Sequence, residues 1–213
     1  MRQVSEIVQL QELIDFYRSQ LLLTLNYHAC DTYRQFFEAM TQALVYCQQY
    51  FVLQGRLLSP AYTGKSEFRW FISFVFFRAA FTCNERILYQ LLRRTAPDNG
   101  FDVNGWTLGK AYRALAEQTG TNATHYRAFD ILDAMNALLN RQQYSMFAND
   151  HEALTTYRTQ TFISTYGQKV DLINPTLLFT ILQDIGELFA GQIAETATPA
   201  ACSLTPGRKS ANG

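Results

Sequence analysis

Charged residues are scarce in this sequence, and neither sign of charge dominates. Charged side chains make up 17% of the 213 residues, with 18 basic and 18 acidic groups. A chain without net charge lacks the overall basic character that is typical of nucleic-acid-binding proteins. The distribution is uneven, because residues 56–127 carry ten basic groups against five acidic ones. Solvated helix faces and internal ion pairs are the simplest explanation for that segment, and contacts to phosphate or carboxylate are the alternative.

Cysteine pairs and long apolar runs are also missing. The four cysteines are widely spaced and form no C-x-x-C pair, which favours reduced thiols in a cytosolic protein: Cys30, Cys47, Cys83 and Cys202. The first residues, MRQVSEIVQL, include polar and acidic side chains where a signal peptide needs apolar ones. The longest mainly apolar run, Trp70 to Phe77, has eight residues, far short of the roughly 20 that cross a bilayer. We therefore expect a cytoplasmic protein that does not contact membranes.

The usual sequence signatures of enzymes are absent as well. The three histidines, His28, His125 and His151, form no H-x-x-x-H or E-x-x-H pattern for a metal ion. The chain has no glycine-rich phosphate loop and no G-x-S-x-G nucleophile turn. The sequence therefore predicts no metal and no cofactor.

Proline is rare, with five residues, and apolar side chains recur at helical spacing along most of the chain. This pattern predicts an all-α fold, a single bundle of about seven helices with short connections. A helical hairpin over 4–56 would pack on a region over 65–195, and 196–213 would form a flexible tail. The helices are expected near 7–21, 36–51, 67–94, 108–118, 122–147, 152–166 and 175–189.

Individual residues mark several of these boundaries. Thr107 is expected to cap the helix that begins at Leu108, and Gly120 to close it. The segment FRWFISFVFF is apolar almost all round, so we expect it to be the central helix. The clearest apolar stripe lies near the C-terminus and consists of Leu178, Ile181, Leu182, Ile185, Leu188 and Phe189.

A row of polar residues extends one apolar helix face. Ile131, Leu132, Met135, Leu138 and Leu139 share a face, which Gln142, Ser145, Met146 and Asn149 continue at helical spacing. Buried hydrogen-bonding side chains cost free energy unless they have partners. The row is therefore expected to line a cleft or a subunit contact, and its amides to lie near another chain or a bound strand.

The order of segments from residue 65 to 195 resembles the HEPN superfamily, particularly its abortive-infection branch in bacterial phage defence. The resemblance rests on FISFVFFRAAFTCNERILYQLL, then WTLGKAYRAL with its Thr-Leu pair, then LLNRQQYSMFANDHEAL. It implies a helical protein whose R-N-x-x-x-A-H-x-D motif lies at a dimer interface. In that family the arginine and histidine of the motif cut RNA without a metal, using the RNA's own 2′-hydroxyl as nucleophile.

This sequence departs from the family motif at both catalytic positions. Aligning Ala148 with the alanine of the motif places Asn149 at the histidine position and Gln143 at the arginine position. Asparagine cannot move a proton near neutral pH as histidine does, and glutamine carries no charge. The resemblance therefore implies a site that has lost its activity. An alternative motif would use Arg141 and His151, although Arg141 is expected to face solvent or to pair with Asp130.

Three functions remain open from the sequence. The first is a non-catalytic HEPN-like interaction protein, a homo-oligomer or a subunit or regulator of a phage-defence or toxin–antitoxin system, which contacts RNA or a protein. The second is an endoribonuclease that uses Arg141 and His151, and the third is a structural subunit of an unrelated assembly. Candidate interface residues are Gln142, Gln143, Tyr144, Ser145 and Asn149, and candidate RNA or partner contacts are Arg86, Arg93, Arg94, Lys110 and Arg113.

Overall fold

The computed structural model of the chain describes residues 2–25, 31–57, 65–95, 105–121, 125–142, 152–157, 160–165 and 175–197. These residues form six helices and one pair of strands. In chain order the elements are α1 (Arg2–Thr24), α2 (Asp31–Leu57), α3 (Lys65–Thr95), α4 (Leu108–Thr119), α5 (Tyr126–Gln142), β1 (Glu152–Tyr157), β2 (Gln160–Thr165) and α6 (Pro175–Ala197).

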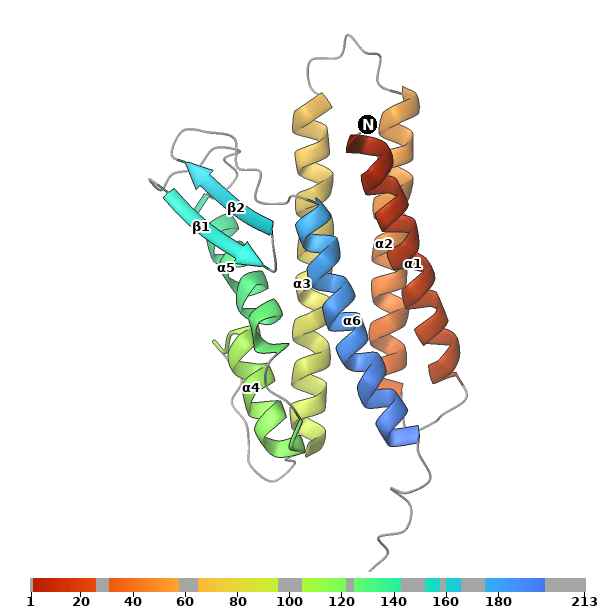
Figure 1. Cartoon of the computed structure of the whole chain (residues 1–213), viewed down its shortest axis with the longest axis vertical. Helices are drawn as coiled ribbons and strands as arrows, with labels where there is room; N and C mark the ends of the chain where they lie inside the picture. The colour runs from red at the N-terminus through yellow and green to blue at the C-terminus, as the bar shows by residue number, and fades with distance from the viewer. Residues whose placement is uncertain are drawn as a thin grey trace, which may run out of the picture.

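The helices form one bundle, as the apolar periodicity predicted (Figure 1). The hairpin of α1 and α2 is antiparallel, and α2 packs in turn against α3. On the other side of α3 lie α4 and α5, while α6 returns to pack along α1. The predicted helical fold is therefore confirmed, with six helices in the described residues in place of about seven.

The helix predicted over 152–166 is wrong, because the described residues of this segment, 152–157 and 160–165, form two antiparallel strands. Glu152 pairs with Thr165 and Tyr157 with Gln160, so the two strands are in full register. The strand sequences, EALTTY and QTFIST, are rich in threonine and also contain isoleucine, phenylalanine and tyrosine. β-Branched and aromatic side chains lose rotamer freedom in a helix and pack well on a pleated surface, which explains the strands.

The short helix α4 begins and ends where its sequence predicted. Thr107 has an extended backbone, and its hydroxyl accepts a hydrogen bond from the Lys110 N–H. Gly120 follows the last turn with φ +69°, the left-handed conformation that glycine adopts without a steric penalty. Both ends of α4 are thus fixed by local chemistry before any packing is considered.

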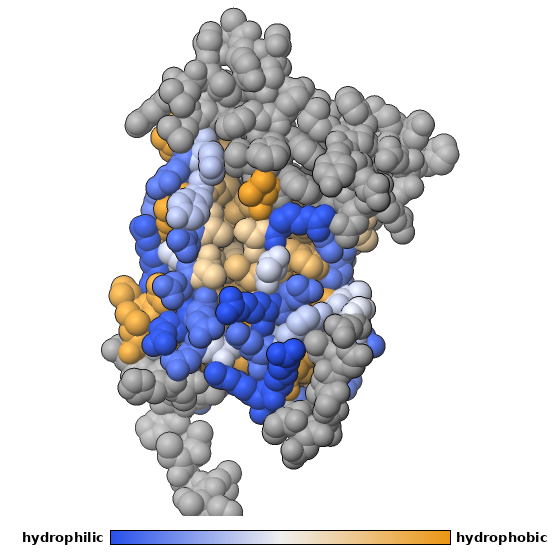
Figure 2. Space-filling model, turned by 180° about the vertical axis from the view of Figure 1, so that it is seen from behind, coloured by the Kyte–Doolittle hydropathy of each residue, from blue (hydrophilic) through white to orange (hydrophobic). Residues whose placement is uncertain are grey.

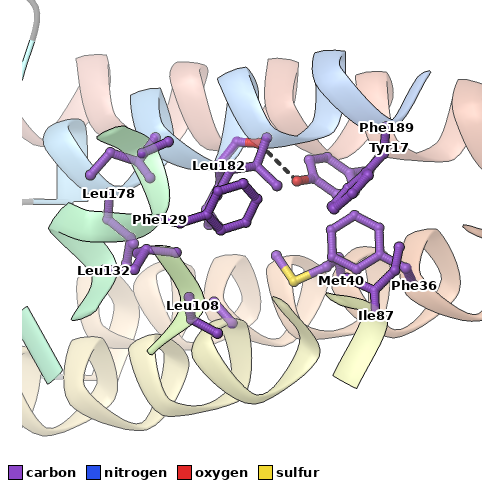
Figure 3. Close-up of a cluster of buried hydrophobic side chains, with 14 of the residues drawn as sticks. Tyr17, Phe36, Met40, Ile87, Leu108, Phe129, Leu132, Leu178, Leu182 and Phe189 are labelled. Atoms are coloured by element: carbon purple, nitrogen blue, oxygen red, sulfur yellow. Dashed lines mark hydrogen bonds between the residues drawn. The ribbon is translucent and has the colours of Figure 1, made fainter. Parts of the chain in front are cut away.

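The core lies where α6 crosses the other helices. Leu178, Ile181, Leu182, Ile185 and Phe189 are buried, which confirms the predicted apolar stripe. Figure 3 shows Leu182 and Phe189 of α6 near Tyr17 of α1 and Phe36 of α2, with Phe129 of α5 beside them. Phe189 packs edge to face against Phe36 at a ring distance of 5.0 Å. Each such buried ring contributes about 1.5–3 kcal/mol through burial alone.

One hydrogen bond ties α1 to α6 inside this core. The Tyr17 hydroxyl donates to the Leu182 carbonyl at 2.8 Å (Figure 3). Tyr17 is fully buried, and burial raises the pKa of its phenol well above the ordinary value, so the hydroxyl keeps its proton and remains a donor. The bond satisfies the one polar atom that this large ring brings into the core.

The segment predicted to be the central helix is less enclosed than expected at its described end. Side chains of α3 are described from Val75 onward, and Val75 is 47% exposed, although Phe76 and Phe77 beside it are buried. Among the side chains that the structure describes, those of α6 are more completely buried than those of α3. The α6 segment Leu177–Glu195 is long and apolar enough to cross a membrane, yet 61% of it is buried inside the bundle, as in the core helix of a globular domain.

Candidate functional site

The N-terminus of α4 is held by a carboxylate from the neighbouring helix α5. The two side-chain oxygens of Asp133 accept hydrogen bonds from the backbone N–H groups of Leu108 and Gly109, each at 2.9 Å. These N–H groups have no partner within α4, so Asp133 satisfies them from outside the helix. Burial raises the pKa of Asp133, and the two backbone bonds oppose that shift.

Gly109 permits this close approach of α4 to α5. A Cβ at this position would lie 1.8 Å from the Oδ1 atom of Asp130, so a larger residue would push the helices apart. Asp130 in turn forms an ion pair with Arg113, one turn further along α4. The two aspartates of α5 therefore fix the position of α4 through its backbone and through one side chain.

Arg113 also stacks on an aromatic ring. Its guanidinium lies 4.6 Å from the ring centre of Tyr126, the first residue of α5. Tyr126 is 40% exposed, and both members of the Arg113–Asp130 pair reach solvent. An exposed ion pair contributes only about 0–1 kcal/mol, so the main effect of this arrangement is to order a cation and a ring at the surface.

A second cation–ring pair lies near the start of α4. The Lys110 amine is 4.4 Å from the ring centre of Trp106, four residues earlier. The Trp106 carbonyl accepts a hydrogen bond from the Tyr89 hydroxyl at 3.2 Å, which ties this residue to α3. Lys110 is exposed and Trp106 is half-buried, so the pair lies at the surface next to α3.

The arginines singled out on α3 lie on its exposed side. Arg93 and Arg94 are exposed in the last turn of the helix, whose final residue, Thr95, donates a hydrogen bond to Gln118 near the C-terminal end of α4. Arg86, two turns earlier, is exposed beside α2. Lys110, Arg113, Arg93 and Arg94, together with the rings of Trp106 and Tyr126, are called the α3–α5 surface below.

The residues of the HEPN-like motif are only partly described. Arg141 and Gln142 are the last two residues of α5, and nothing is described of their side chains. Gln143, Tyr144, Ser145, Asn149 and His151 lie outside the described residues. The face that leads to the polar row is confirmed as a core face up to Met135, because Ile131, Leu132 and Met135 are buried.

The contacts between α4 and α5 could not be predicted from the spacing of residues in the sequence. Arg141 was expected to face solvent or to pair with Asp130. The Arg141 side chain lies outside the part that the structure describes, and Asp130 pairs with Arg113, 17 residues earlier. Trp106 and Asp133 were not singled out at all. Trp106 directly precedes the Thr107 cap, and its position beside a predicted helix start could have marked it as a candidate. Nothing in the sequence relates Asp133 to Leu108.

A separate apolar groove lies between α2 and α3. It has a volume of about 320 Å³ and is lined by Ala43, Tyr46, Cys47, Tyr50, Val75, Phe76 and Ala79. Seen from behind, hydrophobic side chains gather in the middle of the molecule with hydrophilic ones below them (Figure 2). Burial raises the pKa of Cys47 to about 12, so this thiol stays protonated and is not a nucleophile near neutral pH.

Comparison with protein-family models gives no match for this chain, and comparisons with curated proteins and with solved structures give none either. The resemblance to the HEPN superfamily therefore stays a hypothesis. Within the described residues, no group of three or more histidine, cysteine, aspartate or glutamate side chains is arranged to hold a metal ion. The α3–α5 surface, where Lys110 and Arg113 lie over aromatic rings, is the candidate functional site.

Proposed function

We propose that this protein is a non-catalytic helical protein that binds single-stranded RNA through the α3–α5 surface. The observation that carries the proposal is the pair of cation–ring contacts, Lys110 over Trp106 and Arg113 over Tyr126, on adjoining parts of α4 and α5. Unstacked bases bind on aromatic rings, and the phosphates that follow them bind cations. Arg93 and Arg94 extend the basic character along the end of α3.

The arrangement suits RNA better than a folded protein partner. Flexible cations alone make a diffuse surface, whereas here a ring accompanies Lys110 and another accompanies Arg113, and each ring restricts the position of its cation. Rings with cations beside them are the arrangement that binds single strands with little sequence preference. The described part of this surface presents no large apolar patch of the kind that a protein partner would bury; the exposed large hydrophobic side chain here is Tyr126.

The HEPN resemblance supplies the biological setting of the proposal. A chain with glutamine and asparagine at the catalytic positions would bind RNA without cutting it, as a subunit or regulator in a cytoplasmic phage-defence or toxin–antitoxin system. The order of α3, the short helix α4 starting after Thr107, and α5 supports this setting, since the resemblance was stated on that order.

The binding experiment uses fluorescence anisotropy with a labelled single-stranded RNA in EDTA. The Lys110→Gln, Arg113→Gln double variant is expected to bind at least about tenfold more weakly, because each charge-assisted contact contributes about 1.5–3 kcal/mol. Arg18→Gln is the matched control, since Arg18 is exposed on α1 and far from α4. Equal binding by both variants, or no binding by the parent protein, would overturn the proposal.

Cleavage of the RNA is followed in the same samples. Intact RNA is expected. Cleavage that disappears in the Arg141→Ala, His151→Ala variant would replace the proposal with the endoribonuclease alternative.

A further inference from the structure

A small cleft lies between the N-terminal half of α2 and the second half of α3. Its volume is about 100 Å³, and it is lined by Thr32, Gln35, Phe36, Ala39, Thr82, Cys83, Arg86, Ile87 and Gln90. Phe36 and Ile87 are buried and form the apolar floor, while Gln35, Thr82 and Arg86 are exposed at the rim. The cleft is thus apolar at the bottom and polar at its mouth.

The polar side chains of this cleft have no partners within the described part of the chain. Thr32 is 2% exposed, yet its hydroxyl makes no hydrogen bond to another described residue. The same holds for Gln35, Thr82, Arg86 and Gln90. The fully buried side-chain atoms without a hydrogen-bond partner among the described residues are Gln9 Oε1 and Asn84 Oδ1, so the Thr32 hydroxyl is not one of them, and the anchor for a ligand in this cleft is Arg86.

Arg86 is the charged residue among those that line the cleft, and nearby acids are engaged elsewhere. Burial raises the pKa of Tyr89 and the nearby Glu85 carboxylate adds to that shift, so Glu85 lies on the side of α3 that faces Trp106 and α4. Asp31 pairs with Arg34 at 3.0 Å. No described carboxylate lies within ion-pair distance of Arg86, so its guanidinium remains available to an anion.

The pKa of the Cys83 thiol depends on the nearby Arg86 guanidinium. Burial raises the pKa of the Cys83 thiol, and the positive charge of Arg86 acts in the opposite direction. The guanidinium is therefore close enough to the thiol to influence its ionisation. A ligand bound to Arg86 would lie next to Cys83, which makes the thiol a built-in probe of occupancy.

We propose that this cleft binds a small aliphatic monocarboxylate, with the carboxylate on Arg86 and its short carbon chain on Phe36 and Ile87. The planar guanidinium matches a carboxylate with two parallel hydrogen bonds. Because a cavity of about 150 Å³ accommodates benzene, this smaller cleft suits an acid of about three or four carbons. The inference is independent of the RNA proposal, since none of the lining residues belongs to the α3–α5 surface.

The first test is an NMR titration of the full chain with propionate at constant ionic strength. Propionamide is the matched neutral ligand, because it has the same shape without the charge. Propionate is expected to shift the amide signals of residues around Phe36 and Arg86, and propionamide to bind at least about tenfold more weakly. Equal shifts with propionamide, or stronger binding of inorganic phosphate, would overturn the assignment to a carboxylate.

Variants distinguish propionate binding in the cleft from a general attraction of the anion to positive charge. Arg86→Gln is expected to weaken propionate binding at least about tenfold, while Arg18→Gln, an exposed arginine of α1 outside the cleft, leaves it unchanged. Ala39→Leu fills the rim and keeps Arg86, so it is expected to block binding as well. Loss of binding in Arg18→Gln equal to that in Arg86→Gln would contradict the proposal.

Chemical labelling gives an independent readout. Alkylation of Cys83, followed peptide by peptide by mass spectrometry, is expected to slow when propionate is added to the parent protein. In Arg86→Gln propionate is expected to have no effect on the rate. Unchanged labelling of Cys83 in the parent protein at saturating propionate would place any binding elsewhere and overturn the proposal.

Discussion

At the scale of single residues, Asp133 is a partly buried carboxylate that anchors the start of a helix. Folding removes part of the water around its side chain, and two backbone N–H groups bind the carboxylate oxygens. The net result is a raised pKa, so burial outweighs the hydrogen bonds. Its ionised form is therefore less favourable in the folded protein than in the unfolded chain.

This raised pKa gives a signed prediction for pH dependence. Between the unfolded and folded pKa values of Asp133 the native state binds more protons, so its contribution to stability falls as the pH rises through that window. Carbon-detected NMR titration of the Asp133 carboxyl is expected to show a pKa above the ordinary 3.8. A pKa at or below that value would mean that the two backbone bonds dominate.

Tyr17 allows a test of the single hydrogen bond between α1 and α6. Replacing it with phenylalanine keeps the ring and removes the bond to the Leu182 carbonyl. Tyr17→Phe is expected to lower the free energy of unfolding by about 1 kcal/mol, measured by urea denaturation. The exposed Tyr50→Phe is the control and is expected to change it by less than about 0.5 kcal/mol. An equal loss in both variants would mean that the buried bond adds nothing.

At the scale of elements, α6 crosses α1 at a glycine. A Cβ on Gly186 would lie 2.7 Å from the Phe16 ring and 3.1 Å from the Tyr17 ring. Gly186→Ala is therefore expected to destabilise the protein by about 1–3 kcal/mol through overpacking, partly offset by the better helix propensity of alanine.

Gly191 of the same helix provides the matched control. Nothing lies within 4 Å of a Cβ at that position, and the residue is exposed. Gly191→Ala is expected to stabilise the protein by up to about 1 kcal/mol, since alanine favours the helix. Thermal unfolding of the two variants side by side tests the crossing, and a stabilising Gly186→Ala would show that α1 and α6 are further apart there.

Some boundaries and faces of the helices could be predicted from the sequence. Thr107 and Gly120 set the ends of α4 by local hydrogen bonding and backbone preference, so both could be predicted. The stripe from Leu178 to Phe189 was equally clear, because apolar residues at helical spacing indicate the buried face of a helix. The strand pair at 152–157 and 160–165 was missed because its few apolar residues also fit a helical spacing, although its threonine, isoleucine and aromatic residues favour strands.

At the scale of the whole molecule, the candidate site depends on contacts between distant segments. Arg113 reaches Asp130 and Tyr126 only because α4 and α5 pack side by side, and Asp133 meets the start of α4 for the same reason. Charge counting identified Lys110, Arg113 and the arginines of α3 as a group. It did not reveal the rings beside two of them, since ring and cation pairing is a property of the fold.

The α3–α5 surface also predicts how RNA binding responds to salt. Each phosphate neutralised on a single strand adds a slope of about −0.7 to the dependence of log binding constant on log salt concentration. The Lys110→Gln, Arg113→Gln variant is expected to have a slope shallower by about 1.4 than that of the parent protein. An unchanged slope would mean that these two side chains do not contact phosphates.

The most direct test is to locate the bound RNA on the protein. Ultraviolet cross-linking of a single-stranded RNA to the intact chain, followed by mass spectrometry of the linked peptides, reports which aromatic rings touch bases. The account predicts cross-links at Trp106 and Tyr126, whose rings accompany Lys110 and Arg113. Cross-links confined to α1 and α2, or none at all, would contradict it.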